Sequence, residues 1–215
     1  MQSMTWTMGR LGSRFNLLFE PYKNRVMHSA MGRFLDEPMD LKVGLIEPDG
    51  THCVLPFTTE GTPLSNPEQF ERMNSITFRG YSEKHNLRFE FNVHSVFYPQ
   101  DERLCIMPAF YLEMRINPVH RIRWSEVKLF IRIGRPDTTI TASPDSDGQP
   151  ASIDLSYTNR LSPRADKYSL PDRISDGPHR FVDVNERIVS LNANCEVTEC
   201  NRGLICELPV TDAGS

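Results

Sequence analysis

The chain has 215 residues, of which 39% are hydrophobic and 24% are charged, and this composition excludes a disordered or fibrous protein. The formal net charge of -4 leaves no basic excess that could neutralise a phosphate backbone, so we expect no nucleic acid partner. No apolar run approaches the roughly 18 residues that cross a bilayer, so we expect no membrane insertion.

The cysteines and the first residues bear on the cellular compartment. Five cysteines without a tight CxxC pair indicate reduced thiols rather than a disulfide framework. The first fifteen residues, MQSMTWTMGRLGSRF, lack the apolar core of a signal peptide. We therefore expect a cytoplasmic protein.

The first predicted element is a β-hairpin over residues 41–57. Apolar side chains alternate along its first arm, the proline, aspartate and glycine at 48–50 have turn chemistry, and an extended run follows. Residues 58–75 are polar and contain two prolines, which predicts a loop with one helical turn over residues 67–73. A further strand begins at Ile76.

The strongest strand signal lies at the start of LRFEFNVHSVFYPQ, residues 87–100. Strand residues two apart share a face, so one face carries Leu87, Phe89, Phe91 and Val93 and the other carries Arg88, Glu90, Asn92 and His94. This alternation predicts a half-buried antiparallel strand. We expect the phenylalanines to join the core and the polar side chains to form the wet face of the strand.

Two further alternating runs follow, at residues 106–117 and 127–133. In the first, the apolar side carries Ile106, Phe110, Leu112, Met114 and Ile116, and the other side carries Tyr111, Glu113, Arg115 and Asn117. Pro108 indicates an edge strand or pairing that begins after it. In the second run, Val127, Leu129, Ile131 and Ile133 alternate with Lys128 and Arg132. Together the runs predict a meander or Greek-key sheet.

The remainder of the chain completes an all-β prediction. Residues 138–180 are rich in Ser, Asp, Pro and Gly and predict long surface loops with one hint of a strand, whereas residues 181–208 predict about three short strands. We therefore expect a single antiparallel β-sandwich domain over residues 1–215, supersandwich-like, with long surface loops. The last apolar run fits either a terminal edge strand or a sandwich truncated at its C-terminus.

No candidate for catalysis or metal binding stands out among the residues. His28 and Ser29 lack the GxSxG turn of a serine nucleophile, which favours solvated side chains. Cys195, Cys200 and Cys206 have no CxxC spacing, which favours buried thiols over a zinc site. We therefore predict no catalytic residue, no metal and no cofactor.

Acidic and aromatic residues leave two further alternatives open. Aspartates are scattered through the loop regions, where sequence does not establish the fixed pair of carboxyls that a glycosidase needs. Four aromatic residues could stack on sugar rings, although packing is the more common role for such residues: Tyr81, Tyr98, Tyr111 and Trp124.

Three segments resemble the amino-terminal β-sandwich of bacterial glycoside hydrolases of the β-xylosidase and β-glucosylceramidase types, in which an (α/α)6 barrel follows. They are HSAMGRF at 28–34, LKVGLIEPDGTHCVLPF at 41–57 and ITFRGYSEKHNLRFEFNVHSVFYPQDERLCIMPAFYLEMRINP at 76–118. The resemblance implies that the barrel, absent from this chain, supplies both catalytic carboxylates. It also implies that the sandwich supports or lines the sugar-cleaving domain.

The resemblance makes this chain a noncatalytic portion of a glycosidase whose partner is the helical domain of the same parent protein. Four residues are candidates for contact with carbohydrate or with the partner domain: His28, His94, Tyr98 and Tyr111. The alternative is a stand-alone carbohydrate-binding or protein-interaction sandwich. An independent hydrolase that uses His28 and Ser29, or a metal at the three cysteines, is the least favoured interpretation.

Overall fold

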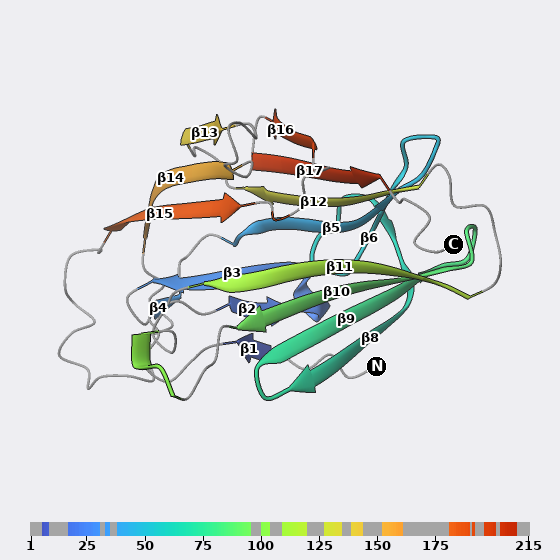
Figure 1. Ribbon diagram of the computed structural model, residues 1–215, viewed down its shortest axis with the longest axis horizontal. Helices are drawn as coiled ribbons and strands as arrows, with labels where there is room; N and C mark the ends of the chain where they lie inside the picture. The colour runs from blue at the N-terminus through green and yellow to red at the C-terminus, as the bar shows by residue number, and fades with distance from the viewer. Residues whose placement is uncertain are drawn as a thin grey trace.

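The structure is a computed structural model, and Figure 1 shows its strands. It describes residues 6–8, 17–30, 33–34, 38–95, 100–103, 109–119, 127–134, 139–143, 152–160, 181–189, 191, 196–200 and 203–209. The described residues form β-strands joined by turns, with one 3-10 turn, η1 (Pro21–Lys23), between the second and third strands, and with helical backbone at residues 102 and 103. Within this part of the chain, no helix has the length and apolar character of a membrane span.

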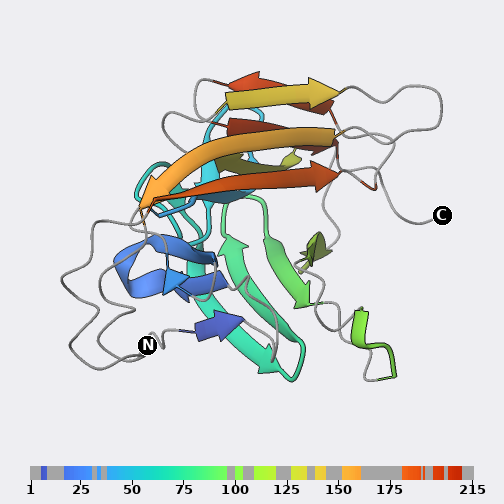
Figure 2. The same cartoon turned by 90° about the vertical axis from the view of Figure 1, so that its left-hand side faces the viewer.

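Two four-stranded antiparallel sheets form from the first half of the chain. The first has the order β1-β2-β3-β4 and comprises β1 (Trp6–Met8), β2 (Leu17–Glu20), β3 (Arg25–Ala30) and β4 (Arg33–Phe34). The second has the order β11-β10-β9-β8 and comprises β8 (Ser65–Arg72), β9 (Ser75–Ser82), β10 (Leu87–Ser95) and β11 (Phe110–Pro118). In Figure 2 the blue strands of the first sheet lie beside the teal and green strands of the second.

Of the other two sheets, one combines early and late strands and the other consists of late strands alone. A six-stranded sheet has the order β16-β17-β12-β5-β6-β7 and comprises β5 (Asp40–Ile46), β6 (His52–Val54), β7 (Thr62–Pro63), β12 (Lys128–Gly134), β16 (Glu196–Cys200) and β17 (Gly203–Pro209). A three-stranded sheet has the order β13-β14-β15 and comprises β13 (Thr139–Ser143), β14 (Ser152–Arg160) and β15 (Phe181–Val189). β5 pairs with β12, which lies far along the chain, so this sheet joins strands that are distant in the sequence.

One apolar cluster connects these sheets. Its buried side chains come from β2, β3, β5, β6, β9, β10, β12 and β14, and from the segments that follow β6 and precede β8 and β12. Phe19 and Phe57 lie against Phe78 with ring centroids 5.0 and 4.7 Å apart, and Phe57 also contacts Phe91 at 6.3 Å. These tilted and edge-to-face arrangements are the ones that aromatic pairs prefer. The fold is thus an all-β, sandwich-like arrangement of antiparallel sheets.

Most of the predicted strands are present. The hairpin over residues 41–57 is β5 and β6, and the alternating run from residue 87 is β10, whose Phe89 and Phe91 are fully buried. β11 is an edge strand that begins after Pro108, as that proline indicated. Residues 181–208 contain β15, β16 and the larger part of β17.

Three expectations are corrected by the structure. Residues 58–75 do not form only a loop with a helical turn, because residues 65–72 form β8, an edge strand that has polar residues on both faces. Within residues 138–180 the hint of a strand is borne out by β14, but the sequence missed a second strand, β13. On β12 the alternation missed Phe130, which is buried on the opposite face, against Ile46 and Val54.

Candidate functional site

One face of the β8–β11 sheet carries mainly polar side chains across all four strands. Directly paired residues of antiparallel strands share a face, so the register defines this polar face. Its members are Glu68, Phe70 and Arg72 of β8, Ser75, Thr77, Arg79 and Tyr81 of β9, Arg88, Glu90, Asn92 and His94 of β10, and Tyr111, Glu113, Arg115 and Asn117 of β11. The opposite face of the same sheet supplies Phe78, Phe89 and Phe91 to the core.

A hydrogen-bonded row crosses the middle of the polar face. The hydroxyl of Thr77 donates to Asn92 Oδ1 at 2.6 Å, and Asn92 Nδ2 donates to Glu113 Oε2 at 3.2 Å. Asn92 is only 6% exposed, so the centre of this face is buried within the chain itself. The bonds orient the Asn92 amide and the Glu113 carboxylate within the free protein.

Arg79 of β9 contacts a residue on each of the two adjacent strands, Glu90 of β10 and Phe70 of β8. Its Nε lies 2.6 Å from Glu90 Oε1, close enough for an ion pair although the N–H is not aligned as a hydrogen bond. Its guanidinium carbon lies 4.3 Å from the centre of the Phe70 ring, which is cation–π geometry. Glu90 is buried beneath these contacts, whereas Phe70 is 42% exposed. The polar face therefore holds a paired charge at its centre and an exposed ring at the β8 edge.

The structure brings two of the four predicted contact residues together. His94 on β10 pairs directly with Tyr111 on β11, so both lie on the polar face. His94 Nε2 lies 3.7 Å from Glu113 Oε2, which forms an ion pair only when the imidazole is protonated. Tyr111 is 55% exposed. An exposed aromatic ring thus stands beside an imidazole and a carboxylate, at the β11 edge of the sheet.

The side chains of the other two predicted residues lie outside the described part of the chain. Tyr98 lies outside the described residues. His28 belongs to β3, where its backbone pairs with Leu17 in the β1–β4 sheet, and its side chain is likewise outside the described part. The zinc alternative also falls there, because Cys195 and the side chains of Cys200 and Cys206 are not described.

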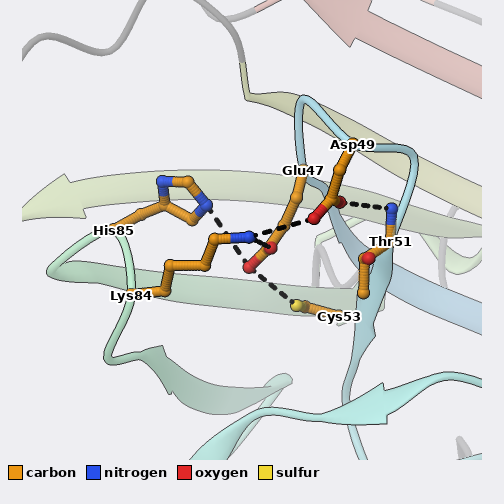
Figure 3. Close-up of polar contacts among 6 residues, drawn as sticks. All are labelled: Glu47, Asp49, Thr51, Cys53, Lys84 and His85. Carbon is orange, nitrogen blue, oxygen red and sulfur yellow. Dashed lines mark hydrogen bonds and ion pairs between the residues drawn. The ribbon is translucent and has the colours of Figure 1, made fainter.

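A second group of polar side chains lies where the β5–β6 turn meets the β9–β10 turn (Figure 3). We call it the Glu47 cluster, and its members are Glu47, Asp49, Thr51, Cys53, Lys84 and His85. Lys84 donates to Glu47 Oε2 and, at 3.1 Å, to Asp49 Oδ2. The Cys53 thiol donates to Glu47 Oε1 at 3.3 Å, and His85 Nε2 lies 3.3 Å from the same oxygen.

The cluster keeps its carboxyl groups ionised. Burial raises the pKa of Glu47, but the hydrogen bonds from Lys84 and Cys53, with the nearby charges of His85 and Lys84, outweigh burial and lower the pKa below 4.5. The backbone N–H of Thr51 donates to Asp49 at 2.9 Å, and this bond, with the Thr51 hydroxyl and Lys84, lowers the pKa of Asp49 to about 2. Both groups are therefore charged at neutral pH.

The Glu47 cluster does not have the chemistry of a cysteine nucleophile. Burial, with the hydrogen bond to Glu47, raises the pKa of the Cys53 thiol to about 12, so the reactive thiolate is scarcely populated. Cys53 is a free thiol and is buried. Within the described residues, no three His, Cys, Asp or Glu side chains converge as a metal site would require. The contacts instead tie one turn to another.

Sequence reasoning missed the Glu47 cluster. It identified residues 48–50 as a turn, but Lys84 lies 37 residues beyond Glu47, and no local pattern connects the two. Only the pairing of β9 with β10 places Lys84 and His85 in the turn that faces Glu47.

Comparison with known proteins gives no match to a family model, to a curated protein or to a solved structure. The resemblance to the amino-terminal sandwich of glycoside hydrolases therefore stays a prediction that rests on the quoted segments alone.

Proposed function

We propose that this chain is a noncatalytic β-sandwich module that supports a sugar-cleaving (α/α)6 domain of the same parent protein, with the polar face of the β8–β11 sheet as the contact surface. The single observation that supports this choice of contact surface is the exposed Tyr111 ring, which lies beside side chains that hydrogen bonds already orient. Exposed tyrosines on a rigid surface lose little conformational entropy on binding, which favours interfaces.

The pairing of the carboxylates supports a noncatalytic role. Retaining glycosidases hold two carboxyl groups about 5 Å apart on either side of the scissile bond. On the polar face, Glu90 is paired with Arg79, and Glu113 with Arg115 at 2.7 Å and with Asn92. These carboxylates are occupied by their neighbours on the sheet, which suits recognition better than hydrolysis.

The coding sequence and the activity of the purified chain test this proposal first. We expect the natural reading frame to continue beyond Ser215 into a helical domain, and a stop codon with no such domain would contradict the proposal. The purified chain should not hydrolyse aryl glycosides. Turnover that one Asp or Glu substitution abolishes would place catalysis in this chain.

Variants in the two-domain parent then test the surface. Tyr111→Ala should weaken the contact between the domains by about tenfold, as loss of an interface aromatic commonly does, and the helical domain should unfold at a lower temperature. Phe181→Ala is the matched control, because Phe181 is an exposed aromatic at the end of β15 in a different sheet. Equal effects of the two variants would contradict the proposed surface.

A carbohydrate ligand is the second candidate for the polar face. The observation in its favour is the same exposed ring beside His94 and Glu113, which together offer stacking and hydrogen-bonding groups. Calorimetric titration of the isolated chain with oligosaccharides should then give saturable heats that Tyr111→Ala removes and Phe181→Ala leaves unchanged. Flat titrations would leave the partner domain as the only candidate for this face.

A further inference from the structure

β11 is an open edge of the β8–β11 sheet. It pairs with β10 along its whole length, from Leu87 opposite Pro118 to Ser95 opposite Phe110. In Figure 1 it lies at the upper margin of the sheet, and within the described residues no strand pairs with its other side. A long edge strand exposes backbone N–H and C=O groups that another strand can pair with.

The opposite edge of the same sheet is protected. In β8, Asn66 has a positive φ of 48°, and the pairing with β9 shifts register between Ser65 and Glu68. Pro67 lies within this irregular stretch and lacks a backbone N–H. Bulges, prolines and charged side chains are the usual devices that prevent pairing at a sheet edge. The regular edge at β11 lacks the proline and the register shift between residues 111 and 117.

We propose that β11 pairs with β11 of a second copy of this chain, antiparallel and centred on Met114, to form a homodimer with a continuous eight-stranded sheet. In this register Glu113 lies opposite Arg115 of the second copy, and Arg115 opposite its Glu113. Leu112 lies opposite Ile116, and Tyr111 opposite Asn117. A two-fold axis through the Met114 pair relates the copies, as in most dimers of identical chains.

Charge selects this register. A shift of two residues in one direction places Arg115 opposite Arg115 of the second copy, and a shift in the other direction places Glu113 opposite Glu113. Like charges directly across a strand pair are destabilising, whereas opposite charges stabilise it. A shift of one residue would place apolar side chains opposite the polar ones. Among the registers within two residues of this one, only the register centred on Met114 satisfies both constraints.

The apolar side of β11 also gains from this pairing. Leu112 is 38% exposed although it points to the core side of the sheet, and Met114 and Ile116 are only partly buried at the margin of the core. A strand added at this edge would cover these three side chains with Ile116, Met114 and Leu112 of the second copy. The inference is independent of the proposed function, because it concerns the edge of the sheet rather than what binds its face.

Sedimentation and hydrogen exchange of the whole chain test the dimer. The sedimentation coefficient of the wild-type chain should rise with concentration from a monomer to a dimer value. The exchange of backbone amides in residues 111–117 should slow over the same concentration range. A wild-type chain that stays monomeric at every concentration, or dimerises without added protection of these amides, overturns the proposal.

Charge reversal tests the register. Glu113→Arg and Arg115→Glu should each lower the dimer population at least tenfold, because each places like charges opposite one another. An equimolar mixture of the two variants should dimerise again, since one copy then carries arginine at both positions and faces a copy that carries glutamate at both. Arg88→Glu, an exposed reversal within the sheet on β10, is the control that should leave the dimer intact.

The mixture separates this proposal from its alternatives. Circular dichroism first shows that each variant is folded, and Arg115→Glu serves if Glu113→Arg is not, because Arg115 is the more exposed of the pair. In that case Arg115→Glu should lower the dimer population, whereas Arg115→Lys, which keeps the positive charge, should leave the dimer intact. Dimers that survive Arg115→Glu, a mixture of the two folded reversals that stays monomeric, or a loss of the dimer in Arg115→Lys as large as in Arg115→Glu, overturn the proposed pairing.

Discussion

The carboxylate of Glu47 is 6% exposed, and yet its pKa lies below the ordinary value. Burial favours the neutral acid, so the neighbours must supply more stabilisation of the charged form than burial removes. Lys84 and Cys53 donate hydrogen bonds to it, and His85 adds a nearby positive charge when protonated. Removing the charge would therefore weaken the hydrogen bonds that Lys84 and Cys53 donate to this side chain.

Glu47 makes the stability of the protein depend on pH. Because its pKa is lower in the folded chain than in the unfolded chain, its contribution is fully present above about pH 4.5 and is lost as the pH falls through the folded pKa. We expect Glu47→Gln to lower the free energy of unfolding by about 1–2 kcal/mol at neutral pH and to reduce the loss of stability in acid. Denaturant titrations at several pH values measure both effects.

Asp154→Asn is the matched control for Glu47→Gln. Asp154 also has a lowered pKa, because Arg187 donates two hydrogen bonds to it, but this pair is exposed to solvent. Exposed ion pairs contribute little to stability. A larger effect from Asp154→Asn than from Glu47→Gln would show that burial of the carboxylate is not what matters.

At the scale of the element, Gly44 sets the approach of β5 to β6. Gly44 pairs with Val54 on one side and with Phe130 of β12 on the other. A Cβ atom at this position would overlap the backbone carbonyl oxygen of Cys53, which a side-chain rotation would not relieve. Because Gly44 has no side chain, β5 can pack closely against β6 next to the buried Phe130 ring.

Gly44→Ala should therefore destabilise the protein although it adds a single methyl group. We expect a loss of at least about 1–3 kcal/mol in the free energy of unfolding, as for other overpacked sites. Gly50→Asn is the control, because Gly50 lies in an open turn with a φ of 82° that asparagine tolerates better than most residues. Thermal unfolding of the two variants compares them, and a smaller loss for Gly44→Ala would contradict this account.

The strands that sequence predicted are those whose two faces differ. In β10, apolar residues alternate with polar ones, so period-two patterning is enough to place the element. In β8, polar residues occupy both faces because the strand is an exposed edge, and the pattern resembles that of a loop. The sequence placed His94 and Tyr111 on polar faces, but only the register of β10 with β11 makes them neighbours.

At the scale of the whole molecule, aromatic side chains join sheets that backbone hydrogen bonds leave separate. Phe19 belongs to the β1–β4 sheet, whereas Phe78 and Phe91 belong to the β8–β11 sheet. Phe57, which follows β6, contacts all three rings, with centroids 4.7 to 6.3 Å apart. Contacts of this kind are set by tertiary packing, so sequence predicted that the β10 phenylalanines would be buried but not which rings they would meet.

Because Phe57 contacts both sheets, it should couple their unfolding. We expect the wild-type chain to unfold in one cooperative transition, with coincident curves from far-UV and near-UV circular dichroism. Phe57→Ala should lower the free energy of unfolding by about 3–5 kcal/mol, and Phe57→Leu, which leaves a smaller cavity, by less. Two separate transitions in the wild-type chain would show that the β1–β4 sheet folds independently of the β8–β11 sheet, and that the Phe57 contacts do not unite them.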